Sequence, residues 1–268
     1  MNQQQHPAND SKESGATNRQ RVSGEANDQP AASIRASKEE ERMKDLSGLQ
    51  ALVTGGTSGI GRATAEALAR EGARVLISGR NEARGAEVVG AIRARGGAAE
   101  FVRADLESAG DVHALAERGA SVDILINNAG VFPVGITHEF PEAMFDKAFD
   151  VNVKAPFLLT AAIAPKMVAR GSGTIINITT VAAELGMVGL SVYGASKAAL
   201  ALLTKAWAAE YGPKGVRVNA VAPGPTITPG TEAMGLPRSS RPFPSVAPPI
   251  PARSPRRSSS SPPTGRAT

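Results

Sequence analysis

The stretch Thr54-Gly55-Gly56-Thr57-Ser58-Gly59-Ile60-Gly61 decides the fold of this chain. A short apolar run, Leu49-Gln50-Ala51-Leu52-Val53, comes directly before it and predicts a β-strand. Residues 62–70, which follow it, combine strong helix formers with apolar residues at helical spacing. The order of strand, glycine-rich turn and helix is the context in which a glycine fingerprint indicates a phosphate-binding site.

Each glycine of this turn has a separate expected task. Gly55 permits a tight turn, Gly59 lets the backbone approach a pyrophosphate, and Gly61 lets the helix pack closely against the strand. The helix N-terminus then presents unpaired N–H groups and the positive end of its dipole to the anion. An ordinary glycine-rich loop is the alternative, and the flanking strand and helix argue against it.

The rest of the chain alternates predicted strands with predicted helices. Strands are expected at 74–78, 100–103, 122–126, 174–178 and 216–221, and helices at 81–95, 108–118, 141–169 and 191–211. Ser108 is a candidate N-cap, and Pro156 and Pro165 are expected to bend or interrupt the long helix. Short apolar strands joined by helices predict a parallel sheet covered on both faces, so the fold class is α/β with a doubly wound, Rossmann-type sheet.

Composition excludes several classes of site. Aromatic residues make up only 4% of the 268 residues, so the core is expected to be aliphatic. The absence of cysteine excludes disulfides, thiolate zinc sites and a cysteine nucleophile, and it fits a reducing compartment, so a cytoplasmic protein is expected. Three scattered histidines predict no metal site, and no apolar run is long enough for a membrane span. The polar N-terminus resembles neither a signal peptide nor a transit peptide.

Both ends of the chain differ from its middle. Residues 1–47 hold almost no large apolar side chains, and residues 236–268 are dominated by Pro, Ser, Arg and Ala. Neither segment can bury enough apolar surface to offset the entropy of ordering, so both are expected to be disordered around a single domain at 48–235. Six arginines and no acid lie within 238–268 and account for the positive net charge of +5.

Further motifs place the chain beside a known family. Asn127-Asn128-Ala129-Gly130 follows the fourth predicted strand, Asn152 lies within Val151-Asn152-Val153, and Tyr193 precedes Lys197 by four residues. Together with the glycine turn and Pro223-Gly224, they occur in the order and spacing of the short-chain dehydrogenase/reductases, which the chain resembles over residues 48–235. The resemblance implies an NAD(P)(H)-dependent oxidoreductase that interconverts a ketone or aldehyde and an alcohol.

The resemblance also implies catalytic roles. Tyr193 and Lys197 share one helix face, and a neighbouring ammonium is expected to lower the pKa of the Tyr193 phenol so that it serves as general acid and base. Asn152 resembles the asparagine that holds a water in the family's proton relay; a helix-interior asparagine with a local hydrogen bond is the alternative. Thr180, thirteen residues before Tyr193, stands where the family has a serine that holds the substrate carbonyl. Its hydroxyl offers the same hydrogen bond, and its methyl group narrows the space.

Cofactor preference is predicted from the end of the second strand. Ser78-Gly79-Arg80-Asn81 has no acid for a ribose 2′-hydroxyl, and Arg80 is suited to a 2′-phosphate, which favours NADP(H) over NAD(H). Arg80 opening the next helix without a ligand is the alternative. The expected cofactor-binding residues are Gly55, Thr57, Ser58, Gly59, Ile60, Gly61, Arg80, Asp105, Leu106, Asn128, Ala129, Gly130, Tyr193, Lys197, Pro223 and Gly224.

After Pro223-Gly224 the chain departs from the family pattern. Residues 226–235 resemble the start of a substrate-covering loop, but the expected helix and edge strand are replaced by the arginine- and proline-rich tail, a composition typical of a shifted reading frame. A remnant that binds cofactor or misfolds without turnover is therefore the alternative to an active enzyme, and homo-oligomer assembly is left open. An arginine arm that binds nucleic acid is a third hypothesis, the least favoured. The expected partner is a small carbonyl or alcohol substrate, whose identity the sequence does not indicate.

Overall fold

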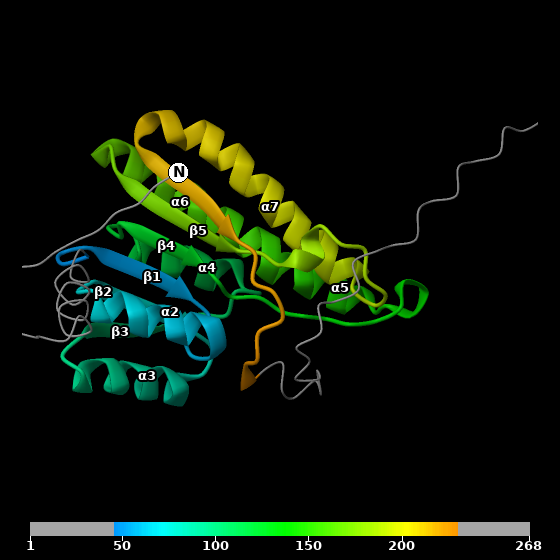
Figure 1. Ribbon diagram of the computed structural model, residues 1–268, viewed down its shortest axis with the longest axis horizontal. Coiled ribbons are helices and arrows are strands. Elements are labelled where there is room, and N and C mark those ends of the chain that lie inside the picture. Colours follow the sequence, from blue (N-terminus) through cyan, green and yellow to red (C-terminus); the bar gives the residue numbers. More distant parts are fainter. Residues whose placement is uncertain (1–45, 230–268) are drawn as a thin grey trace, which may run out of the picture. The chain divides into compact units, whose positions relative to one another are not determined.

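The computed structural model describes residues 46–229, which form a sheet of six strands with flanking helices (Figure 1). The strands are β1 (Gln50–Thr54), β2 (Arg74–Gly79), β3 (Ala98–Arg103), β4 (Ile124–Asn127), β5 (Gly173–Ile178) and β6 (Val216–Val221). All pairs are parallel, and the strand order is β3-β2-β1-β4-β5-β6. The order reverses between β1 and β4, the point at which open α/β sheets bind their ligands.

Six α-helices of the described residues cover the two faces of the sheet. They are α2 (Gly59–Arg70), α3 (Glu82–Ala94), α4 (Ala109–Arg118), α5 (Glu142–Phe149), α6 (Ala155–Arg170) and α7 (Ser191–Tyr211). Side chains alternate along β1: Ala51 and Val53 pack in the cluster beneath α2 and α3, whereas Leu52 packs in the cluster formed with α4, α6 and α7. Helices therefore pack on both faces of the sheet, and the predicted doubly wound α/β fold is confirmed.

Most element boundaries follow from local sequence signals. Helix α7 begins and ends where predicted, because Gly212 and Pro213 follow it directly. The expected N-cap Ser108 accepts a hydrogen bond from the Asp111 N–H at 3.2 Å. Asn81, predicted as the first residue of a helix, instead caps α3 and accepts from the Arg84 N–H at 2.9 Å.

The long helix predicted at 141–169 is interrupted beside Pro156. Helix α5 is followed by a π-helical turn at Asp150–Lys154, and α6 begins after that turn. Pro156 lies in the first turn of α6, and in a regular helix its ring would clash with the carbonyl of residue 152, which belongs to the π-helical turn. The predicted interruption therefore occurs next to Pro156, whereas α6 continues through Pro165.

The predicted disordered segments, 1–47 and 236–268, lie outside the described residues except for Leu46 and Ser47. The Leu46 N–H donates to the Glu71 carbonyl at 3.1 Å, and the Leu46 side chain packs against the cluster beneath α2 and α3. Leu46, one of the two described residues of the predicted disordered segment, is therefore packed against the domain.

The aromatic residues of the core are few and unevenly placed. Trp207, the only tryptophan of the chain, is 4% exposed on α7, and its ring centroid lies 6.2 Å from that of Phe157.

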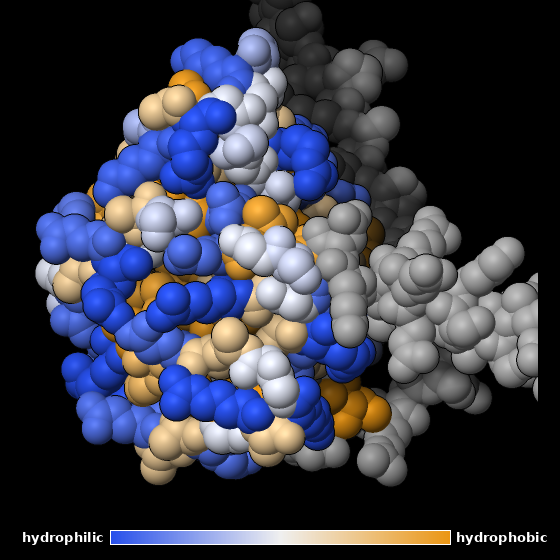
Figure 2. All heavy atoms as spheres, turned by 90° about the vertical axis from the view of Figure 1, so that its left-hand side faces the viewer, coloured by the Kyte–Doolittle hydropathy of each residue, from blue (hydrophilic) through white to orange (hydrophobic). Residues whose placement is uncertain are grey.

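Figure 2 shows the side of the molecule on which the strands begin, where hydrophilic side chains predominate and hydrophobic ones are scattered. Within residues 46–229, no helix is both long and apolar enough to cross a membrane.

Candidate active site

A cavity of about 690 Å³ opens where the strands end. Its lining comes from the segments that follow all six strands, from Gly55 after β1 to Pro223 after β6. Every site residue predicted from the sequence lines this cavity except Asn152. The fold therefore brings together motifs that are spread over most of the described chain.

The glycine-rich turn has the geometry expected of an anion cradle. Gly55 and Gly59 adopt φ values of +64° and +53°, which side chains other than glycine rarely tolerate. A Cβ on Gly61 would lie 2.3 Å from the Gly55 carbonyl oxygen and 2.4 Å from Nδ2 of Asn128. Helix α2 thus begins directly against the turn, with its N-terminal N–H groups at the cavity.

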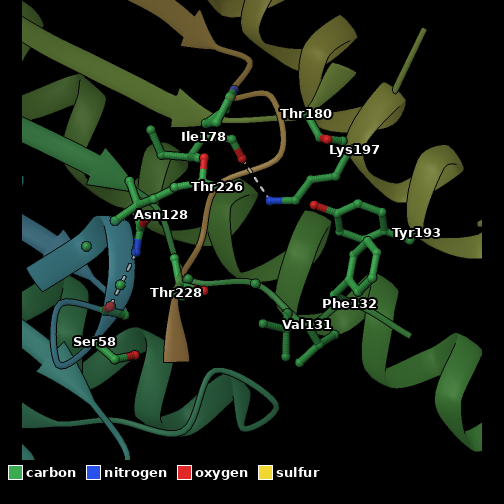
Figure 3. A pocket seen from close by; sticks show the side chains of 18 of the residues that line it. Ser58, Asn128, Val131, Phe132, Ile178, Thr180, Tyr193, Lys197, Thr226 and Thr228 are labelled. Carbon is green, nitrogen blue, oxygen red and sulfur yellow. Dashed lines mark hydrogen bonds between the residues drawn. The ribbon is translucent and has the colours of Figure 1, made fainter. Parts of the chain in front are cut away.

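The turn is held in place by the segment that follows β4. The Thr54 hydroxyl accepts from the backbone N–H groups of Asn128 and Ala129, both at 3.0 Å. Nδ2 of Asn128 donates in return to the Thr54 carbonyl at 2.8 Å and contacts the Gly55 carbonyl at 3.3 Å (Figure 3). This exchange of hydrogen bonds couples β1 to β4 at the point where the strand order reverses, and so holds the glycine turn against the segment after β4.

Arg80 lies at the charged end of the cavity, together with Arg84, Asp105 and Glu107. Its guanidinium is 3.5 Å from the Glu107 carboxylate, which also pairs with Lys147 of α5 at 2.5 Å. Sequence reasoning missed Glu107 because nothing local marks an acid 27 residues away as a neighbour of Arg80. The sequence has no acid at the end of β2, but the fold places the Glu107 carboxylate there. Lys147 already neutralises part of the charge of this carboxylate.

Asp105 and Leu106 form the wall that follows β3. The Asp105 carboxylate accepts from the Glu107 N–H at 3.2 Å, and its own N–H donates to the Asp111 carboxylate at 2.8 Å. Leu106 is 9% exposed and packs in the cluster with α4, α6 and α7. The pair thus presents a fixed edge to the cavity.

Tyr193 and Lys197 point into the same part of the cavity (Figure 3). Burial raises the pKa of the Tyr193 phenol above its ordinary value, and a hydrogen bond with the Thr180 side chain opposes that rise. The sequence predicted the opposite direction, on the ground that the nearby ammonium would lower this pKa. Burial dominates in the protein without a bound ligand, so the phenol keeps its proton at neutral pH.

Lys197 is buried at 3% exposure and is held at its tip. Its Nζ donates to the Ile178 carbonyl at 2.8 Å, and a Cβ on Gly130 would lie 3.2 Å from the same nitrogen. Burial lowers the pKa of Lys197 to about 8, because the charged form loses its hydration. A side chain at position 130 would therefore crowd the Lys197 ammonium.

This lowered pKa predicts a pH dependence of stability. Between pH 8 and pH 10.5 the unfolded chain binds more protons at Lys197 than the folded chain does, so the free energy of unfolding rises with pH. The cost of burying the ammonium is fully present below pH 8. From pH 8 to 9.5, wild-type protein is expected to gain about 1–2 kcal/mol relative to Lys197→Met, measured by urea denaturation. Lys205→Met, at an exposed position of α7, is the control; a slope equal in all three proteins contradicts the assignment.

Asn152 lies within the π-helical turn and is fully buried. Its Oδ1 accepts from the Val131 N–H at 2.9 Å, and its Nδ2 donates to the Val131 carbonyl at 3.0 Å and to the Ser196 hydroxyl at 3.0 Å. The Asn152 side chain therefore connects three segments through hydrogen bonds: the π-helical turn, the loop that follows β4, and α7. Its contacts are long-range, so the alternative of a merely local hydrogen bond does not hold.

Thr180 lies where β5 leads into the loop before α7. Its Oγ1 accepts from the Ala182 N–H at 3.3 Å, and its side chain also bonds to Tyr193. The hydroxyls of Thr180 and Tyr193 are therefore neighbours at one end of the cavity. Thr226 and Thr228, which sequence reasoning did not single out, also line the cavity, and a Cβ on Gly59 would lie 3.2 Å from the Thr228 methyl carbon.

Known proteins resemble this chain in sequence and in fold. A family model described as short chain dehydrogenase matches residues 50–237. An uncharacterized oxidoreductase of Thermotoga maritima is 40% identical over 191 residues, 70% of this chain and 76% of that protein. A solved structure of a short chain dehydrogenase/reductase family protein is 53% identical with a TM-score of 0.69, over 71% of this chain and 80% of that one.

A second solved structure bears on the cofactor. It is a putative NAD(P) dependent gluconate 5-dehydrogenase from Beutenbergia cavernae with bound NADP, 39% identical with a TM-score of 0.69, covering 72% of this chain and 78% of that one. No group of three or more His, Cys, Asp or Glu side chains within residues 46–229 is arranged to hold a metal ion. The chain belongs to the short-chain dehydrogenase family, a family of NAD(P)-dependent oxidoreductases that act on alcohols and ketones.

Proposed function

We propose that this chain reduces a small ketone to a secondary alcohol, and catalyses the reverse reaction, with Tyr193 as general acid and base. The observation that carries the proposal is that Tyr193, Thr180 and Lys197 meet at one end of a cavity whose other end is the glycine cradle. A dinucleotide lying along the cavity would span from the cradle to these three side chains. When bound, the nicotinamide supplies the hydride.

The residues present fit a nucleotide of this kind. The Gly61 position has no room even for a methyl group, and the N–H groups at the start of α2 remain free of intrahelical partners, as an anion requires. Asn128, Ala129 and Gly130 form the floor between the cradle and Lys197. We propose that these residues, together with Asp105 and Leu106, hold the cofactor.

Each catalytic side chain has a defined task in the proposal. Thr180 donates a hydrogen bond from its hydroxyl to the substrate carbonyl oxygen, keeps its own proton, and so fixes the carbonyl beside Tyr193. As hydride reaches the carbon, the electron pair of the C=O bond moves to oxygen, which takes the Tyr193 proton. The raised pKa of Tyr193 keeps this proton in place until that oxygen becomes basic. Lys197 places a positive charge beside the phenolate that forms, and Asn152 holds the loop and helix around it.

The proposed activity is tested by following NADPH oxidation at 340 nm with a panel of neutral ketones and diketones. Turnover that depends on both the ketone and Tyr193 supports the proposal. Turnover that is unchanged when Tyr193 is replaced contradicts the assignment of the acid. The reverse reaction, with secondary alcohols and NADP⁺, is expected to accelerate as pH rises, because the base form of Tyr193 must then be present.

We also propose that NADP(H) is preferred over NAD(H). Arg80 is 60% exposed in its side chain at the charged end of the cavity, which leaves its guanidinium available to a 2′-phosphate. Arg84 of α3 lines the same end and adds a second positive charge. Glu107 opposes the preference, but its closer contact is with Lys147, so Arg80 can exchange Glu107 for the phosphate.

This preference predicts opposite effects for two substitutions. Arg80→Gln is expected to weaken NADPH binding about tenfold and to leave NADH binding nearly unchanged, because only NADPH carries the 2′-phosphate. Glu107→Gln removes the competing carboxylate and is expected to tighten NADPH binding about twofold to fivefold. Calorimetric titration measures both, with Glu87→Gln, whose partner Arg62 lies outside the cavity's charged end, as the matched control. Equal losses for both nucleotides in Arg80→Gln would show that Arg80 reads no phosphate.

A second candidate is a chain that binds cofactor without turnover. Within residues 46–229, β6 pairs only with β5, and no described helix covers the α2 side of these two strands, where Ile176 and Ile178 are half-buried. The melting temperature of the purified chain with NADPH and with NADH separates the candidates from simple misfolding. A shift with NADPH together with turnover supports the enzyme; a shift without turnover supports the binding-only chain.

A further inference from the structure

The two ends of the cavity differ in chemistry. The end near the glycine cradle carries Arg80, Arg84, Asp105 and Glu107. The Tyr193 end is lined by nine apolar residues: Val131, Phe132, Val134, Val181, Ala182, Leu185, Met187, Val188 and Leu190. The only charged lining residue at this end is Lys197, which is 3% exposed and already donates to the Ile178 carbonyl. No charged side chain among the described residues is therefore available there for a charged substrate.

Two separate segments build this apolar end and are tied to each other. Residues 131–136 follow β4, and residues 181–190 lead into α7. The Gly135 N–H donates to the Gly189 carbonyl at 3.0 Å, and the hydroxyls of Thr137 and Ser191 lie 3.2 Å apart. A Cβ on Gly189 would lie 3.3 Å from a Val134 methyl carbon. The two apolar walls therefore converge at a fixed separation rather than as independent loops.

Several of these apolar side chains are exposed although they line a concave site. The exposed fractions are 62% for Val134, 37% for Val181, 40% for Leu185 and 91% for Val188. A soluble protein rarely gathers large apolar side chains at the surface unless they bind something. The opposite end of the molecule, seen in Figure 2, has only scattered hydrophobic side chains.

An aromatic wall stands directly beside the proposed acid. The rings of Phe132 and Tyr193 meet edge to face, with centroids 4.4 Å apart and planes at 76° (Figure 3). The Tyr193 hydroxyl is thus framed by an aromatic ring and by the Thr180 side chain, with its methyl group. Hydrocarbon next to the carbonyl of a substrate would contact these groups.

We infer that the substrate is an uncharged, apolar ketone or secondary alcohol, whose carbonyl or hydroxyl group meets Tyr193 and Thr180 while its hydrocarbon portion packs between the two apolar walls. The inference rests on the proposed function of Tyr193 and adds the chemical class of the substrate. An anionic group placed between these walls would lose its hydrating water molecules, and no positively charged side chain there would replace them. Each methylene group of the substrate that is buried there is expected to raise kcat/KM about fourfold.

The first test compares ketones of similar shape and different charge. With saturating NADPH, kcat/KM for 4-ethylcyclohexanone is expected to exceed that for 4-oxocyclohexanecarboxylate by about 100-fold or more. Between cyclohexanone and 4-ethylcyclohexanone, kcat/KM is expected to rise through a lower KM. A preference for the carboxylate, or no gain from the ethyl group, would overturn the inference.

A pair of variants tests the wall itself. Val188→Lys places an ammonium at the mouth of the apolar end and is expected to lower kcat/KM for the neutral ketone about fivefold and to raise it about tenfold for the carboxylate. Leu202→Lys is the matched control, because Leu202 is 68% exposed on α7 and does not line the cavity. Equal responses of the two variants would contradict a substrate wall at Val188.

Binding measurements keep this inference separate from the proposed function. Calorimetric titration of the chain saturated with NADP⁺ measures affinity for each ketone without turnover. Binding of the neutral ketone alone supports the apolar class even if no turnover occurs, in which case only the proposed function fails. Preferred binding of the carboxylate, or no binding of either ketone at millimolar concentration, overturns the inference whatever the turnover.

Discussion

Replacing Tyr193 with phenylalanine is expected to lower kcat for ketone reduction about 10³-fold while changing the Kd for NADPH less than twofold. The substitution removes the only proton donor that the proposal places at the carbonyl oxygen, and general acid catalysis contributes about 10²- to 10⁴-fold. The ring stays, so the edge-to-face contact with Phe132 is kept. The variant also loses the hydrogen bond to Thr180, a small effect because Thr180 still bonds to the Ala182 N–H.

The second tyrosine of the chain provides a matched control. Tyr211 ends the same helix, lies outside the cavity lining, and also has a pKa raised by burial. Tyr211→Phe is expected to leave kcat and KM unchanged. Steady-state kinetics on both variants, with NADPH affinity from calorimetry, separates a lost proton donor from a damaged fold. Equal activity in the two variants would remove Tyr193 from the mechanism.

Substituting Gly61 with alanine is expected to destabilise the domain by about 3 kcal/mol and to weaken binding of either nucleotide by more than tenfold. The new Cβ would lie 2.3 Å from the Gly55 carbonyl oxygen and 2.9 Å from its carbonyl carbon. Both are backbone atoms of the cradle, so no side-chain rotation relieves the overlap. Nδ2 of Asn128, at 2.4 Å, would also be displaced from its bonds with β1.

The control for this substitution is another helical glycine. Gly90 lies in α3, and a Cβ there would meet nothing within 4 Å. Gly90→Ala is expected to stabilise the domain by about 0.5–1 kcal/mol, because alanine loses less backbone entropy in a helix. Urea denaturation of both variants measures the contrast. A loss of stability in Gly61→Ala no larger than about 0.5 kcal/mol would show that the cradle relaxes.

Much of the fold was predictable because its signals are local. Most strands are short apolar runs, and the glycine turn, the Ser108 cap and the Gly212-Pro213 end of α7 each depend on neighbouring residues alone. The π-helical form of the turn beside Pro156 was not predicted, because a proline indicates an irregular helix without indicating which kind. Asn152 bonds to Val131, which lies 21 residues away in sequence, and no pattern within 150–154 indicates that contact.

In the candidate site, too, features with a local sequence signal were predicted, and features that arise from contacts in the folded domain were not. Motif residues such as Gly59, Tyr193 and Lys197 were found from their spacing, and the fold then brought them to one cavity. The partner of Arg80, Glu107, was missed because it lies beyond an intervening helix and strand. The direction of the Tyr193 pKa was wrong because burial, which dominates it, is a property of the packed domain rather than of the Tyr-Lys spacing.

The placement of the aromatic residues has a spectroscopic consequence. Trp207 and both tyrosines, Tyr193 and Tyr211, belong to α7, whereas the cluster beneath α2 and α3 contains neither tryptophan nor tyrosine. Tryptophan and tyrosine fluorescence of the chain therefore reports almost entirely on the α6 and α7 side of the sheet. Loosening of the half that carries the glycine cradle would be nearly silent in this fluorescence, and amide hydrogen exchange is the method that would detect it.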